Sequence, residues 1–284
     1  MDQPRCCSPQ WIEHPVAWQP RLMGKSPPPI NSPFCIVTCD RHELTRDTIQ
    51  APDVFNMAGT YYMYYSVSVI GSQNSDIGVA TSQTMDSGSW TDHGSIGIPA
   101  SASYNRIDGN LFQHDSNSVP LLSFGSYWDN IFQIPMENPP LRIAGGVTHL
   151  AQNTTGGGPV EGGYQFQWGN FYYLFFSSGA CCNTPPNLAA PGDEYKIMVC
   201  RSPTANGGFV DQQGRNCLTQ NGGTLVLASH DNVYAPGGQG VMFDPQQGSP
   251  VVYYHYVNPG NYAYEQFLFG WNKLDFSSGW PVVV

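Results

Sequence analysis

The sequence predicts an all-β protein built from repeated four-stranded units. Charged residues make up only 11% of the chain and aromatic residues 13%, with 31 Gly and 24 Pro, a composition that suits strands and turns better than helices. Short aromatic and aliphatic runs recur between Gly, Ser, Asn and Asp residues. Asp53, Asp108 and Glu161 each precede such a run at a near-constant spacing. Repeats of about 40–50 residues with four strands each are typical of β-propeller blades.

The first 46 residues do not follow this pattern. They contain Pro27-Pro-Pro29 and scattered charges, and Cys35-Ile-Val-Thr-Cys39 is the one stretch there that suits a short strand. We therefore predict an irregular or altered N-terminal segment over residues 1–46 and a propeller domain over residues 47–284.

Four units follow from residue 47 onward, each with four candidate strands. The first unit has them at 54–55, 61–69, 77–82 and 90–94, the second at 111–112, 119–124, 131–134 and 141–143, the third at 164–167, 171–177, 195–200 and 209–210, and the fourth at 240–243, 251–257, 267–271 and toward 280–284. Since the innermost strands of a propeller face one axis, residues at equivalent positions converge there. An Asp before a strand often only caps a turn, but three acids in phase with the repeat favour a shared polar pocket.

Charge limits the classes of ligand. The formal net charge is −10, which argues against nucleic acid, because phosphates require a basic surface, and equally against an anionic membrane surface. No apolar run reaches the roughly 18 residues that a membrane span needs. A neutral ligand such as a sugar is compatible with this charge.

The eight cysteines indicate disulfides and an oxidising compartment. Cys200 and Cys217 flank one hairpin of the third unit and form a plausible pair, although the pairing stays open. Cys181 and Cys182 are adjacent. We expect either that at most one of them forms a disulfide with another cysteine or that the two form a disulfide with each other. Asn153-Thr-Thr155 is a possible glycosylation acceptor. Residues 1–10 lack the apolar core of a signal peptide.

Several stretches in order carry a family resemblance. They include Ala51-Pro-Asp-Val, Tyr104-Asn-Arg-Ile-Asp-Gly-Asn-Leu, Phe124-Gly-Ser-Tyr-Trp, Val160-Glu-Gly and Tyr253-Tyr-His-Tyr. Over roughly residues 47–284 the chain resembles the arabinan endo-1,5-α-L-arabinosidases (endo-arabinanases) of glycoside hydrolase family 43, most closely the secreted fungal type. The resemblance implies a five-bladed β-propeller, of which about four blades are recognisable here.

The resemblance also implies a function and a site. The expected activity is inverting endo-hydrolysis of α-1,5-arabinofuranosidic linkages in plant cell-wall arabinan or arabino-oligosaccharides, with Glu161 as general acid. Asp108 would modulate the pKa of that acid and position it. His255 would bind an ion on the propeller axis, a calcium ion with waters, and no organic cofactor is implied. The implied sugar-binding residues are Gly71, Asn105, Arg106, Ile107, Asp108, Ser126, Tyr127 and Trp128. We expect a secreted monomer.

One element of the family pattern is not found. The family's first blade opens with a His-Asp-Pro motif whose Asp is the general base, and no such motif occurs in this sequence. We also expect Arg106 to lower the pKa of the nearby Asp108. Two alternatives remain open. One is a catalytically inactive propeller that binds arabino-oligosaccharides, and the other is a hydrolase of the same fold that acts on xylan or galactan.

Overall fold

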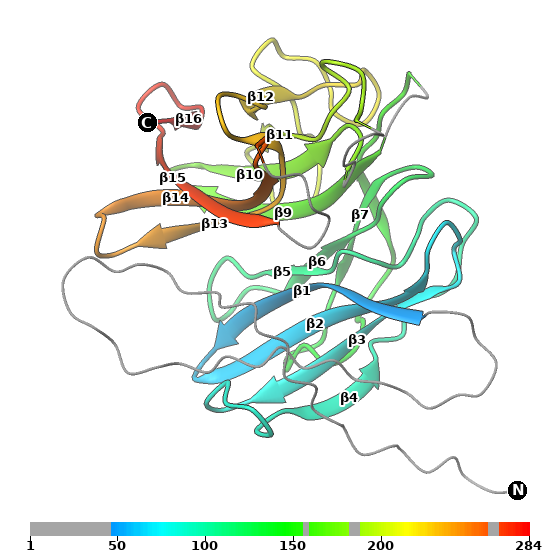
Figure 1. Ribbon diagram of the computed structural model, residues 1–284. Coiled ribbons are helices and arrows are strands. Elements are labelled where there is room, and N and C mark those ends of the chain that lie inside the picture. The colour runs from blue at the N-terminus through cyan, green and yellow to red at the C-terminus, as the bar shows by residue number, and fades with distance from the viewer. Residues whose placement is uncertain (1–46, 156–158, 182–187, 261–266) are drawn as a thin grey trace, which may run out of the picture.

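The computed structural model describes residues 47–155, 159–181, 188–260 and 267–284. These residues form four antiparallel sheets of four strands, each in simple sequential order (Figure 1). The strands are β1 (Asp47–Met57), β2 (Thr60–Val69), β3 (Ser75–Ser82) and β4 (Thr91–Ser95); β5 (Asn110–Phe112), β6 (Leu121–Phe124), β7 (Ile131–Pro135) and β8 (Thr148–Ala151); β9 (Val160–Trp168), β10 (Phe171–Ser178), β11 (Lys196–Ser202) and β12 (Thr224–Leu227); and β13 (Tyr234–Asp244), β14 (Ser249–Val257), β15 (Leu268–Asp275) and β16 (Val282–Val283).

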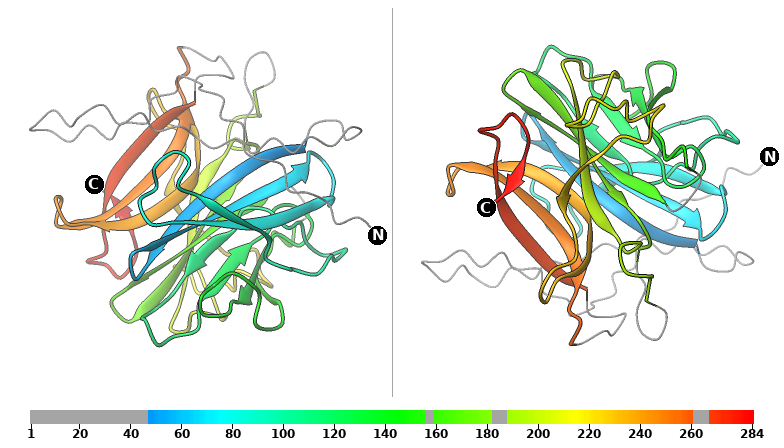
Figure 2. Two further views of the ribbon diagram at one scale, coloured as in Figure 1. Left: turned by 90° about the horizontal axis from the view of Figure 1, so that it is seen from below. Right: turned by 90° about the horizontal axis from the view of Figure 1, so that it is seen from above.

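The sheets are the blades of a propeller, here called blades 1 to 4 in chain order. Their first strands β1, β5, β9 and β13 contact one another in that order, and the views along the perpendicular directions show the blades fanning out around them (Figure 2). The all-β fold and the four predicted blades are confirmed.

Both faces of blade 3 are buried, and this explains the composition of its strands. In β10, Leu174 and Phe176 pack in a cluster with Ile131 of blade 2, whereas Tyr173 and Phe175 pack in a cluster with Val241 and other residues of blade 4. Side chains alternate between the two faces of a strand. A strand buried on both faces must therefore be apolar throughout, as the run Phe171-Tyr-Tyr-Leu-Phe-Phe is.

Three hydrophobic clusters hold the described blades together. One joins blades 1 and 2 through residues such as Tyr64, Ile77 and Leu122; the other two join blades 2 and 3, and 3 and 4. Burying a large aliphatic or aromatic side chain contributes about 1.5–3 kcal/mol. The packing between blades is thus the main stabilising term of the domain.

Polar contacts connect the inner strands near the axis. Asp53 Oδ2 on β1 accepts hydrogen bonds from Asn110 Nδ2 at 3.1 Å and from the backbone N–H of Leu111 at 3.3 Å. Asn110 Oδ1 in turn accepts from the N–H of Gln165 on β9 at 2.9 Å. Burial raises the pKa of Asp53 to about 6, against the effect of these donors. Asp53 therefore ties blade 1 to blade 2.

Two predicted outer strands are wrong. Leu141 and Ile143 pack against the cluster between blades 1 and 2, but the fourth strand of blade 2 is β8. Pro139 and Pro140 precede this segment, and proline lacks the N–H that a strand ladder needs. In blade 3, Val210 makes only isolated bridges, to Arg201 and Asn216, and the fourth strand is β12.

A disulfide fixes the long connection between β11 and β12. Cys200 and Cys217 are bonded, which confirms the expected pair, and both are buried in the cluster between blades 2 and 3. Their separation of 17 residues corresponds to a stabilisation of about 3 kcal/mol in the loop-entropy model. Cys181 is also disulfide-bonded.

The outward face of blade 4 differs from the faces between blades. In β15, Trp271 lies opposite Tyr253 of β14, and Phe269 lies opposite His255. The side chains of Met242, Trp271 and Phe269 on this face remain 49%, 47% and 39% exposed. Blade 4 thus buries one face against blade 3 and leaves apolar side chains accessible on the other.

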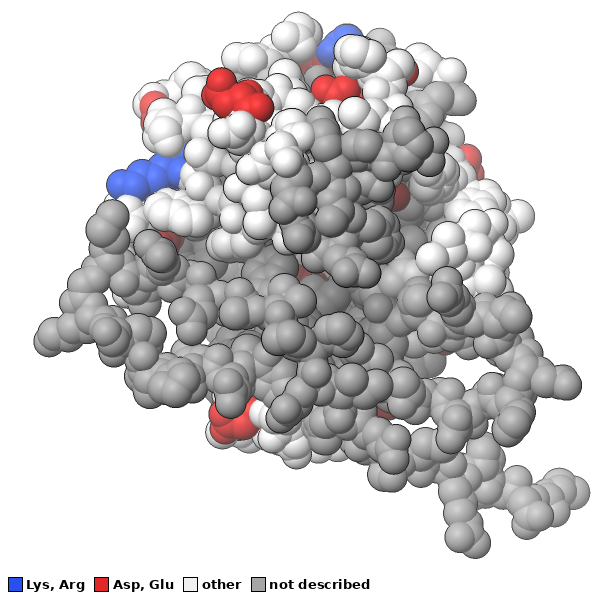
Figure 3. Space-filling view, viewed as in Figure 1, with Lys and Arg blue, Asp and Glu red and all other residues white. Residues whose placement is uncertain are grey.

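Where the face in Figure 3 consists of described residues, it shows few charged side chains, scattered among neutral ones. This distribution matches the low charged fraction of the sequence. The part of the chain that the structure describes contains no helix able to cross a membrane.

Candidate active site

Asp108 and Glu161 meet where two inner strands begin. Glu161 is the second residue of β9, and Asp108 stands two residues before β5 with a left-handed φ of 59°. The N–H of Gly162 donates to Asp108 Oδ2 at 3.1 Å, and the N–H of Asp108 donates to Ser66 Oγ at 3.0 Å. Two acids that are 53 residues apart in sequence are thereby held side by side.

The environment of Asp108 disfavours its charged form. Burial, and then the negative charge of Glu161, raise the pKa of Asp108 to about 7, while the hydrogen bond from Gly162 opposes the shift. The expected lowering by Arg106 is wrong. The Arg106 guanidinium instead lies 3.7 Å from Asp76 and donates to the carbonyl oxygen of Ile98 at 3.2 Å.

Two hydroxyl groups hold the carboxyl group of Glu161. Tyr195 donates to Oε1 at 2.8 Å, and Ser126 donates to Oε2 through a short hydrogen bond. Tyr195 is buried at the start of blade 3's third strand. Burial, then the charges of Glu161 and Asp108, raise its pKa well above the ordinary value, so Tyr195 stays a neutral hydrogen-bond donor.

Blade 4 supports this arrangement from the other side. Gln239 Nε2 donates to the carbonyl oxygen of Gly162 at 2.7 Å, and its Oε1 accepts from Ser177 Oγ at 2.7 Å. A Cβ at Gly237 would lie 2.0 Å from the ring of Tyr195. The glycine is required there because the backbone of β13 packs directly on this ring.

The loop between β6 and β7 faces the acid on one side and solvent on the other. Ser126 is 2% exposed, whereas Tyr127 and Trp128 are 54% and 42% exposed with left-handed φ values of 51° and 47°. Burial and the charge of Glu161 raise the pKa of Tyr127. Strained backbone of this kind is common at binding sites.

The remaining predicted sugar-binding residues lie on two neighbouring segments. Asn105 Oδ1 accepts from Ser75 Oγ at 2.5 Å, and the carbonyl oxygen of Ile107 accepts from the N–H of Gly125 at 2.8 Å. Residues 105–108, 126–128 and 161 are therefore brought together. Gly71 stands in the exposed turn between β2 and β3, with open space around it and φ +80°.

His255 is the predicted ion ligand on β14. Its ring stacks on Tyr195 with 5.9 Å between ring centroids. Burial lowers the pKa of His255 to about 4, and its buried Nδ1 has no hydrogen-bond partner among the described residues. A neutral imidazole with an unused nitrogen fits a ligand. Those residues contain no group of three or more His, Cys, Asp or Glu side chains suited to a metal, so an ion here would rely on water and other oxygens.

Three residues of the site are not foreseen from the sequence. Ser177 and Gln239 belong to different strands, and Tyr195 resembles an ordinary aromatic residue directly before the aliphatic strand β11. These residues could be found only by reasoning from the topology, in which the start of each inner strand lies near the end of the strand beside it. No sequence motif marks them.

The fold and the two adjacent acids define a propeller of the carbohydrate-hydrolase class. A glycosidase typically uses a pair of carboxyl groups, and here a carboxyl with a raised pKa lies beside a second acid held by hydroxyl donors. The chain belongs to the glycosyl hydrolases family 43, whose sequence pattern matches residues 37–281.

Curated relatives and solved structures agree with this assignment. The chain is 57% identical over 240 residues to the probable arabinan endo-1,5-α-L-arabinosidase A of Emericella nidulans, covering 84% of this chain and 74% of the relative. It is 56% identical over 237 residues to the arabinan endo-1,5-α-L-arabinosidase A of Aspergillus aculeatus, covering 82% and 72%.

Among solved structures, an exo-1,5-α-L-arabinanase from a bovine ruminal metagenomic library superposes with a TM-score of 0.74 at 28% identity, covering 84% of this chain and 78% of that one. The α-L-arabinanase of Cellvibrio cellulosa in complex with arabinohexaose superposes with a TM-score of 0.73 at 25% identity, covering 84% and 77%.

Proposed function

We propose that this chain hydrolyses internal α-1,5-arabinofuranosidic linkages of arabinan with inversion, and that Glu161 is the general acid. The observation that carries the proposal is the carboxyl group of Glu161, which lies beside Asp108 and between the hydroxyl groups of Ser126 and Tyr195. The names of the relatives, and the arabinohexaose complex of the Cellvibrio enzyme, support arabinan as the substrate.

The geometry suggests how the acid works. Glu161 transfers its proton to the glycosidic oxygen as the bond from that oxygen to the anomeric carbon breaks. The carboxylate left behind gains charge, and the hydroxyl groups of Tyr195 and Ser126 are already placed to stabilise it. Donors that meet charge where it develops lower the barrier without reorganisation. Asp108 holds the strand of the acid through Gly162 and tunes the electrostatics of the pair.

Inversion also requires a base that removes a proton from the attacking water, about 6.5–9.5 Å from the acid. The His-Asp-Pro motif, whose Asp would be this base by the family resemblance, does not occur in the sequence. This observation favours a second candidate function, a propeller that binds arabino-oligosaccharides without hydrolysing them. Tyr127 and Trp128 follow Ser126 on the same loop and offer exposed aromatic faces, and such faces suit sugar rings in either case.

An assay on linear α-1,5-arabinan separates the two candidates. We expect the purified chain to bind arabinohexaose by calorimetry and to release reducing ends slowly compared with the Aspergillus aculeatus relative, with NMR showing inversion in the first product. Release of arabino-oligosaccharides of mixed length supports endo action. Binding without any release supports the second candidate, and turnover of xylan or galactan in place of arabinan would contradict the proposed substrate.

We further propose a calcium ion held by His255 on the axis, and a secreted monomer as the working form. His255 would bind through its unused ring nitrogen, with waters completing the shell. Calcium prefers oxygen ligands, so the ion would serve to fix the axial end of β14 and, through the stacked ring, Tyr195.

Removal of the ion tests this site. The wild-type chain is first treated with a chelator, and calcium is then added back. We expect the added calcium to raise the melting temperature above that of the chelated chain, because a ligand that binds only the native state stabilises it. His255→Ala should abolish the response, whereas the exposed His114→Ala should retain it. An unchanged response in His255→Ala would contradict the assignment.

A further inference from the structure

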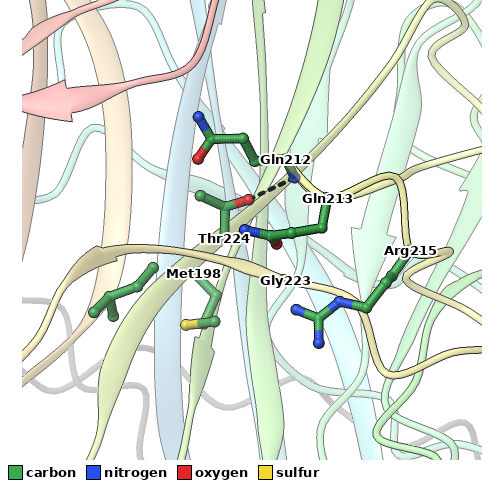
Figure 4. A pocket seen from close by; sticks show the side chains of 7 residues that line it. Met198, Gln212, Gln213, Arg215, Gly223 and Thr224 are labelled. Atoms are coloured by element: carbon green, nitrogen blue, oxygen red, sulfur yellow. Dashed lines mark hydrogen bonds between the residues drawn. The ribbon is translucent and has the colours of Figure 1, made fainter.

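A hollow lies on the outer part of blade 3 (Figure 4). Its floor comes from β11 and β12, and its rim comes from the connection between them. The lining residues are Met198, Gln212, Gln213, Arg215, Gly223, Thr224 and Leu225.

The hollow is separate from the carboxylate pair. Glu161 lies on the inner strand of the blade, while Thr224 and Leu225 lie on the outermost one, with β10 and β11 between them. Three strand spacings of about 4.8 Å put roughly 14 Å between the two strands. No residue of the hollow hydrogen-bonds to the acid network.

A buried carboxylate fixes the rim. Asp211 is 1% exposed, and its Oδ1 accepts from the backbone N–H groups of Gln213 at 3.0 Å and Arg215 at 2.9 Å. Its Oδ2 accepts from Arg215 Nε at 2.7 Å and from the N–H of Gly223 at 3.2 Å. Together with the nearby Cys200–Cys217 disulfide, these contacts hold the rim in one conformation before any ligand arrives.

The rim presents polar groups that nothing in the described chain uses. The side-chain amides of Gln212 and Gln213 make no hydrogen bond there, and Arg215 uses only Nε. Figure 4 shows the side chains of Gln213 and Arg215 extending from the rim toward Thr224 and Gly223. Amides and a guanidinium supply both donors and acceptors, while Met198 and the 53% exposed Leu225 supply an apolar surface.

We propose that this hollow is an accessory binding site for a neutral arabinofuranose segment of the same polymer; the proposal rests on the function proposed above. Hydroxyl pairs of the sugar would meet the two amides and the free guanidinium nitrogens, and its C–H face would lie on Met198 and Leu225. A neutral ligand is favoured because the charge of Arg215 is already matched by Asp211 and the chain carries a net charge of −10, which repels polyanions.

A second site on one polymer would raise the effective concentration of linkages at the acid. The gain would be seen with long arabinan and not with short oligosaccharides that cannot reach both sites. The rim therefore tunes preference for polymer length without touching the reaction.

NMR titration of the full chain with arabinohexaose tests the proposal. In a Glu161→Gln background, which slows hydrolysis, the methyl signal of Met198 and the indole signal of Trp128 report the two sites separately. The Met198→Leu variant assigns the methyl signal. We expect both signals to shift, with the Met198 methyl titrating independently. A Trp128 shift without any Met198 shift overturns the accessory site and leaves the proposed function standing. Absence of both shifts overturns both.

Variants then locate the ligand. The double variant Gln212→Ala, Gln213→Ala removes two amides that make no internal side-chain contact. It should weaken the Met198 titration about tenfold, as expected for lost hydrogen bonds, and reduce retardation in gels containing linear arabinan. Gln246→Ala, Gln247→Ala on the turn between β13 and β14 is the matched control and should change neither. A Met198 shift with a trigalacturonate and none with arabinohexaose would overturn the neutral-sugar assignment.

Discussion

Replacing Glu161 with Gln is expected to lower the hydrolysis of linear arabinan by roughly 10²–10⁴-fold, the usual contribution of a general acid. Glutamine still accepts the hydrogen bonds of Tyr195 or Ser126 on one atom, so the site should keep its shape, but it has no proton to give to the leaving oxygen. The initial rate of reducing-end release, normalised to the wild-type chain, measures this loss.

An activated substrate sharpens the test. An aryl arabino-oligosaccharide with a strongly acidic phenol needs little protonation of its leaving group, so Glu161→Gln should retain most of the rate on it. Glu137→Gln, at an exposed position, serves as the matched control and should behave as wild type on both substrates. Equal losses of Glu161→Gln on both substrates would contradict the role of general acid.

Replacing Asp108 with Asn is expected to stabilise the fold at neutral and alkaline pH while lowering turnover. The pKa of Asp108 is raised from 3.8 to about 7 by burial and by the charge of Glu161, so above neutrality the native state must hold two adjacent charges. Asparagine removes one of them and can still accept the hydrogen bond from Gly162. The free energy of unfolding should increase by on the order of 2–4 kcal/mol at pH 8, as measured by chemical unfolding.

The pH dependence follows from the direction of the shift. The native state binds the proton of the Asp108 carboxyl group more tightly than the unfolded chain does. The contribution of this proton to the free energy of unfolding is therefore fully present below about pH 4 and is lost as pH rises through about 7. The wild-type free energy of unfolding should therefore fall across this window. Asp53, whose pKa is about 6, contributes to the same fall, so Asp108→Asn should keep a smaller decline between about pH 4 and 6.

A control separates this effect from general removal of negative charge. Asp275 is exposed on the end of β15, and hydrogen bonds from Ser277 lower its pKa. Asp275→Asn should leave the decline between pH 4 and 7 in place. If Asp108→Asn also kept the full decline, the buried carboxyl would not be its source.

The sequence predicts the second strands of the blades better than the outermost ones, for a physical reason. β10 and β14 pack against neighbouring blades, and their aromatic runs are a strong strand signal. Outermost strands are short and partly exposed, so their apolar signal is weak. Phe209 gives a stronger apolar signal, although it is a buried residue of the connection that the Cys200–Cys217 disulfide closes and not of a strand. The apolar pair Phe209-Val210 indicates a buried segment, but a buried segment need not be a strand.

Some features of the candidate site could likewise be predicted from the sequence and others could not. The in-phase spacing of Asp108 and Glu161 anticipates their meeting, because strand starts at equivalent positions converge. It does not anticipate that Ser126 binds the acid itself while Tyr127 and Trp128 turn outward, since a left-handed loop decides that orientation. The same spacing included Asp53, which the structure uses to join two blades.

The packing of the blades also governs how the molecule comes apart. Blades 2 and 3 are clamped on both faces, whereas the outward face of blade 4 leaves Trp271 and Met242 accessible. Among the described blades, one packed on a single face opens at a lower free energy than one packed on both faces. Glu161 lies in blade 3 and Tyr195 directly precedes its third strand, but Gln239 and His255 belong to blade 4. Opening of blade 4 would release the supports of the acid while the acid itself remained in a folded sheet.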